Sequence, residues 1–302
     1  MEFEEFKRKI TEGLQEIYGD NAELDTGVII KNNGSKYNGI WIGLKDLECR
    51  TDPIIELDSI YAAFESGRKS LEDCVRDIYR KRAAFRNPEE IEQFAERAME
   101  WELVKNKIYP ILLSTEDNQE ILKDLVFTSM LDLSVVYIVR GQLSARCATS
   151  IKITHGLLKY YGVSVEKLHD QAMENLEKDG YEFQDLESMV MQMFHVEAAE
   201  KDNDEEDHKQ EIYILTNASK SYGAAGILNR KLLREFAGDR DFIILPSSIH
   251  ETLFIPVTDK TNQEFFDEMV SEVSRTQVSL EERLTDHSYY YDAEIGEIRM
   301  CA

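Results

Sequence analysis

The sequence predicts an α+β protein with mixed or antiparallel sheets and flanking helices. Strand-like and helix-like segments alternate along the chain, which indicates that both kinds of element are present. Several neighbouring β-rich runs are joined only by short polar turns, and such hairpins pair their strands antiparallel. The clearest examples flank Asn32-Asn33-Gly34 and occupy the stretch between Phe242 and Val257.

An N-terminal α+β region is expected over residues 1–105. Its first helix is indicated by apolar residues at spacings of three and four, from Phe3 to Ile17. A hairpin over residues 24–44 follows, because an Asn-Gly pair supplies the positive φ values of a tight turn. Ser70 with Asp73 predicts a capping box at the start of a helix that reaches about residue 85.

A second α+β region is expected over residues 106–302. Its predicted strands cover 108–113, 131–140, 147–154, 212–215 and an antiparallel pair at 242–245 and 253–257, with a last pair around 292–296. Its helices cover 118–125, 165–178, 186–199, 223–236 and 263–275. Residues 197–211 hold eight acids, two lysines and hardly any apolar side chain. This composition predicts a flexible acidic loop.

The composition limits the possible classes of function. With 59 acidic and 35 basic residues among 302, the formal charge is −24, which disfavours direct binding of nucleic acid through its phosphates. The four cysteines form no CxxC pair, so neither a zinc ribbon nor a disulfide scaffold is indicated. The acidic N-terminus is unlike a signal peptide, and no run approaches the roughly 20 apolar residues of a membrane span. We therefore expect a cytoplasmic protein without membrane association, metal or cofactor.

The polar turn Ser247-Ser248-Ile249-His250-Glu251 between two apolar strands is the first candidate site. A histidine beside serine hydroxyls and a carboxylate could supply a base, a nucleophile and an orienting acid. The turn matches neither the Gly-x-Ser-x-Gly elbow nor the HExxH helix. In an extended segment Ser248 and His250 share a face that Glu251 does not. A turn capped by serine hydroxyls, with a surface histidine, is therefore favoured over a catalytic role.

Candidate binding residues lie at two other places. Asn217 and Tyr222 follow a predicted strand and precede a predicted helix, whose N-terminus could hold an anion. The Gly-Lys-Ser/Thr ending of a phosphate loop is absent, so an ordinary capped connection is favoured. Asp132 stands between two leucines in an otherwise apolar predicted strand, where an unpaired buried carboxylate would be costly. It is a candidate acid or ligand, and a solvent-facing position is the commoner alternative.

Two charged segments need separate consideration. Residues 68–86 hold seven basic and three acidic residues, which leaves a charge of +4. They form either a patch for an acidic partner or a solvated helix face with internal ion pairs. The acids between Asp202 and Asp207 do not have the spacing or the central glycine of an EF-hand loop, so no metal site is assigned to them.

Several motifs together resemble an uncharacterised bacterial family. They are Leu131-Asp-Leu-Ser-Val-Val-Tyr137, Ile212-Tyr-Ile-Leu-Thr-Asn217, Gly223-Ala-Ala225, Leu245-Pro-Ser-Ser-Ile-His-Glu251, Met269-Val270 and Thr276-Gln-Val278. The resemblance implies an association with gut Gram-positive anaerobes and their conjugative elements. More distantly, Tyr109-Pro-Ile-Leu-Leu-Ser114 and Gly223-Ala-Ala-Gly-Ile-Leu-Asn229 are similar to segments of the YtpQ-like family. Neither resemblance implies a reaction.

Three functions follow from these observations as hypotheses. The first is a non-catalytic cytoplasmic accessory protein of a mobile genetic element that binds a macromolecule, with an unknown protein as partner. The second is an acidic mimic of nucleic acid that inhibits a DNA-binding protein. The third is a hydrolase or transferase that uses His250 with Ser247 or Ser248. Ordered rows of acids would favour the mimic, and convergent side chains in a pocket would favour the enzyme.

Overall fold

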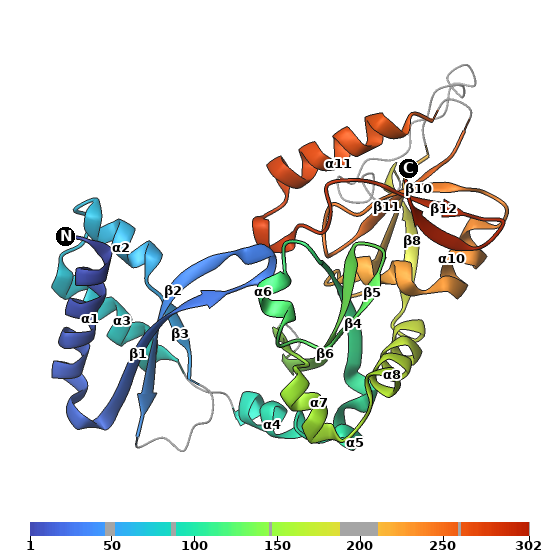
Figure 1. Cartoon of the computed structure of the whole chain (residues 1–302). Coiled ribbons are helices and arrows are strands. Elements are labelled where there is room, and N and C mark those ends of the chain that lie inside the picture. Colours follow the sequence, from blue (N-terminus) through green and yellow to red (C-terminus); the bar gives the residue numbers. More distant parts are fainter. Residues whose placement is uncertain (46–51, 86–88, 145–146, 188–210, 259–260, 302) are drawn as a thin grey trace. The chain divides into compact units, whose positions relative to one another are not determined.

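The computed structural model describes residues 1–45, 52–85, 89–144, 147–187, 211–258 and 261–301. Most of the expected 186–199 helix and of the expected acidic loop at 197–211 lies outside the described residues. The chain divides into two compact units (Figure 1). Unit 1 comprises residues 1–100 and 142–148, and unit 2 comprises residues 101–141 and 149–302. The sheets are antiparallel wherever their register is described, and the α+β prediction is confirmed.

The sheet of unit 1 is built on the predicted hairpin. Its strands are β1 (Ala22–Ile30), β2 (Lys36–Leu44) and β3 (Ile54–Glu56), in that spatial order. Asn33 and Gly34 both have positive φ, 55° and 66°, as the hairpin turn requires. The register runs from Ala22 opposite Leu44 to Ile30 opposite Lys36, so Asn-Gly sets the pairing as expected.

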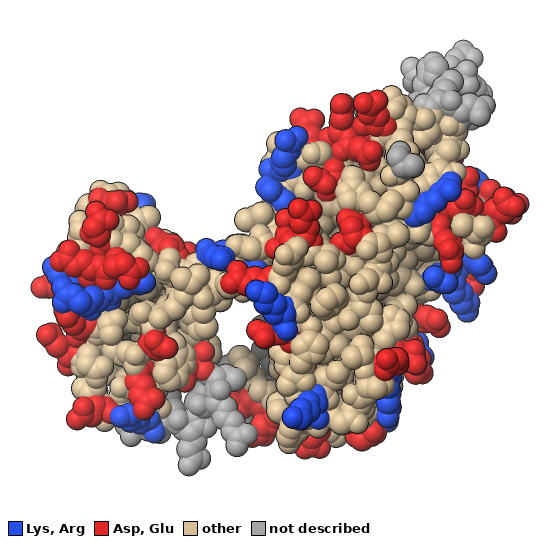
Figure 2. Space-filling view, viewed as in Figure 1, with Lys and Arg blue, Asp and Glu red and all other residues tan. Residues whose placement is uncertain are grey.

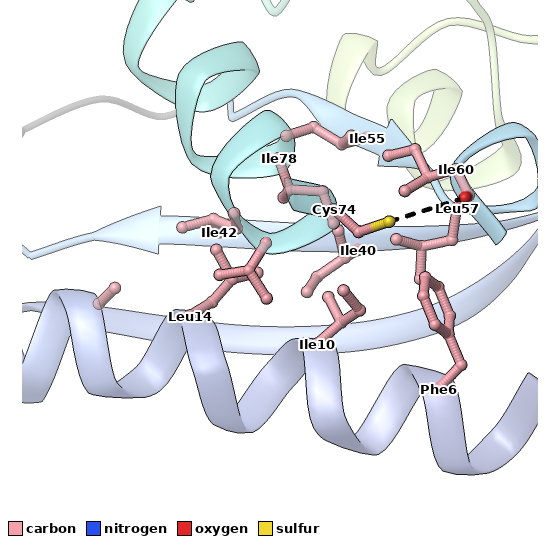
Figure 3. Packing of buried hydrophobic residues seen from close by; sticks show 12 residues of the cluster. Phe6, Ile10, Leu14, Ile40, Ile42, Ile55, Leu57, Ile60, Cys74 and Ile78 are labelled. Carbon is pink, nitrogen blue, oxygen red and sulfur yellow. Dashed lines mark hydrogen bonds between the residues drawn. The ribbon is translucent and has the colours of Figure 1, made fainter. Parts of the chain in front are cut away.

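Three helices build the core of unit 1 on one face of that sheet. They are α1 (Phe3–Tyr18), α2 (Asp58–Glu65) and α3 (Leu71–Ala84), and α4 (Glu89–Arg97) follows. Figure 3 shows side chains of α1 packed against those of β2 and α3, with Phe6, Ile10 and Leu14 fully buried. The predicted capping box is present: Ser70 Oγ accepts from Asp73 N, and the Asp73 carboxylate accepts from Ser70 N.

Unit 2 contains a first sheet of four strands. These are β4 (Ile108–Ser114), β5 (Phe127–Met130), β6 (Leu133–Ser144) and β7 (Cys147–Lys152), with β6 bonded to the other three. The accompanying helices are α5 (Trp101–Val104), α6 (Gln119–Leu122), α7 (His155–Tyr161) and α8 (Val165–Glu177). On α8 the buried Asn175 Nδ2 donates to the carbonyls of Lys105 and Ile108, which fixes the helix to the start of β4.

A second sheet of six strands completes unit 2. Its order is β13 (Glu297–Met300), β12 (Tyr289–Asp292), β10 (Phe242–Leu245), β11 (Thr252–Pro256), β9 (Tyr213–Asn217) and β8 (Tyr181–Asp185). The predicted pairing of residues 242–245 with 253–257 is confirmed, with Leu245 opposite Leu253. Pro246 follows β10 and Pro256 ends β11, the expected positions for residues that cannot donate to a ladder.

Helices cover both faces of the six-stranded sheet. The helix α11 (Gln263–Gln277) places Phe266 and Val270 against Ile243 and Ile255. The helix α10 (Arg230–Ala237) places Phe236 against Phe242, whose side chain points to the opposite face from that of Ile243. The sheet is therefore packed on both sides. In the described residues, no helix has the length and apolar character needed to cross a bilayer.

One predicted helix is wrong in extent. Residues 223–236 were expected to form one helix, but a 3-10 segment (Gly223–Leu228) is followed by α10. Asn229 separates them because its backbone leaves the helical region and its side chain accepts from Leu232 N as an N-cap. The break keeps the residues before it close to the end of β9, where the candidate site lies.

Candidate functional site

The structure brings two of the sequence-predicted sites together. The turn at 247–251 leads into β11, and the connection at 217–223 leaves the neighbouring strand β9. Tyr222 N donates to His250 Nδ1 at 3.3 Å, and Thr216 Oγ1 donates to the His250 carbonyl at 3.1 Å. Ala224 N donates to the Ile249 carbonyl at 3.2 Å. The two loops are therefore held to each other through the main chain around His250.

The 217–223 connection is under conformational constraint. Lys220 and Tyr222 have positive φ, 51° and 55°, which is unfavourable for residues with a side chain. At Gly223 an added Cβ would stand 2.2 Å from the His250 carbonyl oxygen and 2.5 Å from Thr216 Oγ1. Glycine is required there because the two backbones approach too closely for any other residue.

Asn217 is buried and organises its own loop. Its Oδ1 accepts from Ser219 Oγ at 2.9 Å and from Ser221 N at 3.2 Å, and its Nδ2 donates to the Ser221 carbonyl at 3.0 Å. These three bonds all lie within five consecutive residues. Asn217 therefore supports Tyr222 in its position beside His250.

The imidazole of His250 is also engaged within the protein. Its Nδ1 accepts from Tyr222 N, and its Nε2 lies 3.5 Å from Glu282 Oε1. The described contacts of the imidazole are with Tyr222 and Glu282, and not with the hydroxyls of Ser247 or Ser248.

The two serines of the turn have structural contacts. Ser248 Oγ accepts from His250 N at 3.0 Å, an ordinary serine turn. The Ser247 carbonyl accepts from Leu284 N, and Ile249 N donates to the Glu282 carbonyl. Glu251 follows the turn and is half-buried. A general base needs a free lone pair, and the Nδ1 lone pair already accepts the Tyr222 N–H.

Asp132 does not lie inside a strand, which corrects the expectation from sequence. β5 ends at Met130 and β6 begins at Leu133, so Leu131 and Asp132 form a two-residue hairpin turn. Leu131 has a φ of 53° and is 42% exposed, an unusual position for a leucine. The strand prediction failed because Leu131 is apolar, as strand residues often are, and therefore did not indicate a turn.

Asp132 has partners that sequence reasoning missed. Tyr289 Oη donates to Asp132 Oδ1 at 2.7 Å, and His287 Nε2 lies 3.4 Å from Asp132 Oδ2. His287 Nδ1 lies 3.3 Å from Asp286 Oδ1. The Nε2 contact has the distance of an ion pair but not the angle of a hydrogen bond, and among the described residues this buried nitrogen has no hydrogen-bond partner. The run of three tyrosines at 289–291 favours a strand but does not indicate which residue it meets.

The electrostatics of this cluster favour a charged pair. The Asp132 carboxylate beside Nε2, with a smaller effect of Asp286, raises the pKa of His287 above its usual value although burial opposes this. Burial by itself would raise the pKa of Asp132, but the contacts with His287 and Tyr289 together hold that pKa below its usual value. Burial and the Asp132 carboxylate raise the pKa of the fully buried Tyr289 strongly, so its phenol stays protonated and donates.

Three of the seven basic residues at 68–86 form ion pairs within unit 1. Arg82 is buried, donates to the Ile42 carbonyl at 2.9 Å and pairs with Asp52 at 2.6 Å. Lys69 pairs with Asp77, and Arg76 lies 3.6 Å from Asp73. Among the residues that the structure describes, no group of three or more potential ligands is placed to hold a metal ion.

The chain belongs to a family of unknown function, DUF5688, whose model matches residues 3–293. Comparison with curated proteins and with solved structures found no match.

Proposed function

We propose that this member of the DUF5688 family is a non-catalytic accessory protein that binds a protein partner through the outer face of α11. One observation carries the proposal. The inner side of α11 anchors in the sheet through Phe266 and Val270, while its outer side combines three glutamates with an exposed phenylalanine. An exposed aromatic residue flanked by charge is typical of the anchors of protein interfaces.

The glutamates of α11 form one row. Glu264, Glu268 and Glu272 are spaced four residues apart, so they follow one another on the helix at about 6 Å. In the described part of the chain none of them forms an ion pair, whereas Arg8 and Lys178 neutralise Glu12 and Glu174 on other helices. In Figure 2 acidic side chains gather over α11.

Phe265 lies beside this row and is 52% exposed. Leaving so much aromatic surface in water forgoes burial free energy, which a partner would recover. The combination of an apolar ring and unpaired carboxylates fits a partner whose surface is basic and partly apolar. A row of carboxylates attracts a basic surface and repels phosphate, so a protein partner rather than nucleic acid is proposed.

The two other functions receive less support. A nucleic-acid mimic needs rows of acids that extend over a surface. The row on α11 has only three members, and acids on α1 and α8 pair with neighbouring lysine and arginine. An enzyme using His250 with Ser247 or Ser248 needs a serine hydroxyl at the imidazole. The contacts described for this imidazole are with Tyr222 and Glu282.

The setting of the protein is also a proposal. Location in the cytoplasm, carriage on a mobile element of gut Gram-positive anaerobes and the distant similarity to the YtpQ-like family are supported by the sequence motifs alone. They are consistent with an accessory protein that acts on a partner encoded by the host or by the element.

Affinity capture with matched variants tests the proposed surface. The full chain, a Phe265→Ser/Glu268→Lys variant and an Ile17→Ser/Glu16→Lys control are immobilised, and bound proteins are quantified by mass spectrometry. The control removes an equally exposed apolar residue, 50% for Ile17, and an exposed acid from α1. We expect a partner that the control retains and that the α11 variant loses by about tenfold, with binding that weakens as salt increases. Equal retention of every protein by the α11 variant and the full chain would contradict the proposal.

A further inference from the structure

The charge of the His287 ring decides whether its contacts with two carboxylates are attractive. Both ring nitrogens face carboxylate oxygens, Nε2 that of Asp132 at 3.4 Å and Nδ1 that of Asp286 at 3.3 Å. A neutral imidazole has a single N–H, so one nitrogen would direct its lone pair at a carboxylate. The imidazolium instead carries positive charge on the side of both carboxylates. The geometry itself therefore favours the charged ring.

This ring connects two sheets of unit 2. Asp132 belongs to the turn between β5 and β6 in the four-stranded sheet, and Tyr289 begins β12 in the six-stranded sheet. Their hydrogen bond joins residues 157 positions apart. Thr285 fixes the segment 285–287 that precedes β12, because its Oγ1 donates to the His287 carbonyl and accepts from His287 N.

Among the residues that the structure describes, two carboxylates act on His287. Asp132 acts on it from the hairpin turn and Asp286 from its own segment, and the ring of Tyr289 meets the imidazole edge-on at 5.2 Å between centroids. The charges that act on Tyr289 are the same two carboxylates. The direction of the His287 pKa, above its usual value, agrees with this arrangement.

We propose that Asp132, Asp286, His287 and Tyr289 form a pH-sensitive latch that holds the β5–β6 turn to the six-stranded sheet. The latch is closed while His287 is an imidazolium between its two carboxylates. When the ring loses its proton, the attraction to Asp132 is lost, and the turn is retained by the Tyr289 hydroxyl and the Thr115 N–H bond to the Asp132 carbonyl. Opening is favoured further because Leu131 leaves an unfavourable backbone conformation.

The consequence is local mobility that increases with pH. The equilibrium between closed and open turn changes by up to tenfold for each pH unit by which the pKa of His287 in the closed state exceeds that in the open state. The effect is confined to the turn, because β6 remains bonded to β4 over residues 133–139. A surface turn carrying an exposed leucine would thus be ordered at mildly acidic pH and mobile at mildly alkaline pH.

Hydrogen exchange of the full chain at pH 5.5 to 8.5 tests the latch. Amides of residues 127–133 are compared, after correction for the intrinsic rate, with those of residues 22–30 in β1 as an internal reference. We expect their relative protection to fall by about tenfold across this range in the wild type. It should be lower and independent of pH in His287→Gln. The control His155→Gln changes an exposed histidine and should behave as the wild type.

A second measurement keeps the proposal testable if His287→Gln folds poorly. NMR titration of the His287 ring in the wild type should give the same midpoint as the change in exchange, and Asp286→Asn should lower both midpoints together. The Asp286 side chain is 78% exposed, so this variant leaves the packing intact. Protection of the turn that does not change with pH, or an exchange midpoint that Asp286→Asn leaves in place, would overturn the latch.

Discussion

The turn at His250 and the segment at His287 both place an imidazole near a glutamate or aspartate, yet the second ring nitrogen has a different kind of neighbour in each. At His250 one nitrogen must accept, because the Tyr222 N–H points at Nδ1, and the other faces Glu282. At His287 both nitrogens face carboxylates. The first arrangement requires Nδ1 to accept a hydrogen bond, and the second attracts positive charge to the ring. A nearby acid is common to both sites, so the main-chain N–H at Nδ1 is what distinguishes the hydrogen bonding of His250 from that of His287.

The largest expected effect is at the close approach beside His250. Gly223→Ala should lower the free energy of unfolding by about 2–3 kcal/mol, because the new Cβ would overlap the His250 carbonyl. Urea denaturation measures the loss. Gly156→Ala is the matched control, since its Cβ would approach Thr154 Oγ1 no closer than 3.7 Å. An equal effect of the two substitutions would show that the loops separate readily.

His250→Ala should destabilise the protein by about 2 kcal/mol at pH 8.5, because the Tyr222 N–H loses its acceptor. The free energy of unfolding of this variant is compared with that of His287→Gln at the same pH, which lies above the usual pKa of histidine. We expect the His287 variant to be close to the wild type there. If the two variants were equally destabilised at pH 8.5, the contrast between the two imidazoles would not hold.

Tyr289→Phe should cost about 1.5 kcal/mol, because it removes a hydrogen bond to an ionised carboxylate and keeps the buried ring. Thermal unfolding at pH 6 is the measurement. Tyr291→Phe serves as the control, since the Tyr291 hydroxyl is buried and has no hydrogen-bond partner among the described residues. A smaller loss of stability in Tyr289→Phe than in Tyr291→Phe would show that the hydrogen bond to Asp132 does not stabilise the fold.

The stability difference between wild type and His287→Gln should depend on pH. The pKa of His287 is raised in the folded state, so its contribution is fully present below about 6.5 and is lost as pH rises through the higher folded value. The pKa of Asp132 is lowered, so its contribution is present above about 3.8 and is lost as pH falls below that. The difference in urea midpoint should therefore be greatest between about pH 4 and 6.5. A difference that increases toward pH 8 would contradict the assignment.

The smallest effect has the opposite sign. Leu131→Asn should stabilise the protein by about 0.5 kcal/mol, because asparagine tolerates positive φ better than leucine. Thermal unfolding detects the change, and Phe127→Asn, another exposed apolar residue on the same hairpin, is the control. A destabilised Leu131→Asn would show that the leucine side chain makes a contact worth more than the backbone strain.

Sequence reasoning succeeded where the determining chemistry is local. Asn33-Gly34 fixed the first hairpin, Ser70 with Asp73 began α3, and the apolar runs on either side of the 247–251 turn paired as predicted. It also placed His250 in a turn. Which groups meet the imidazole could not be derived, because Tyr222 and Glu282 approach from separate elements.

The Asp132 cluster could not be derived for a related reason. Leu131 is apolar and sits where glycine is favoured, so the turn has no sequence signal. The partners of Asp132 come from the far end of the chain, and a single sequence does not indicate pairings over such a distance. The 3-10 segment at 223–228 was missed because the apolar pattern continues across Asn229, although Asn229 is the N-cap of the next helix.

The bond between Asp132 and Tyr289 also sets an order of events during synthesis. Asp132 leaves the ribosome while Tyr289, 157 residues later, has not yet been translated. Contacts so distant in the chain form late, after the local hairpins and helices. The carboxylate and the strained Leu131 turn therefore face solvent in the growing chain, and the four-stranded sheet acquires its last restraint only when the C-terminal strands are released.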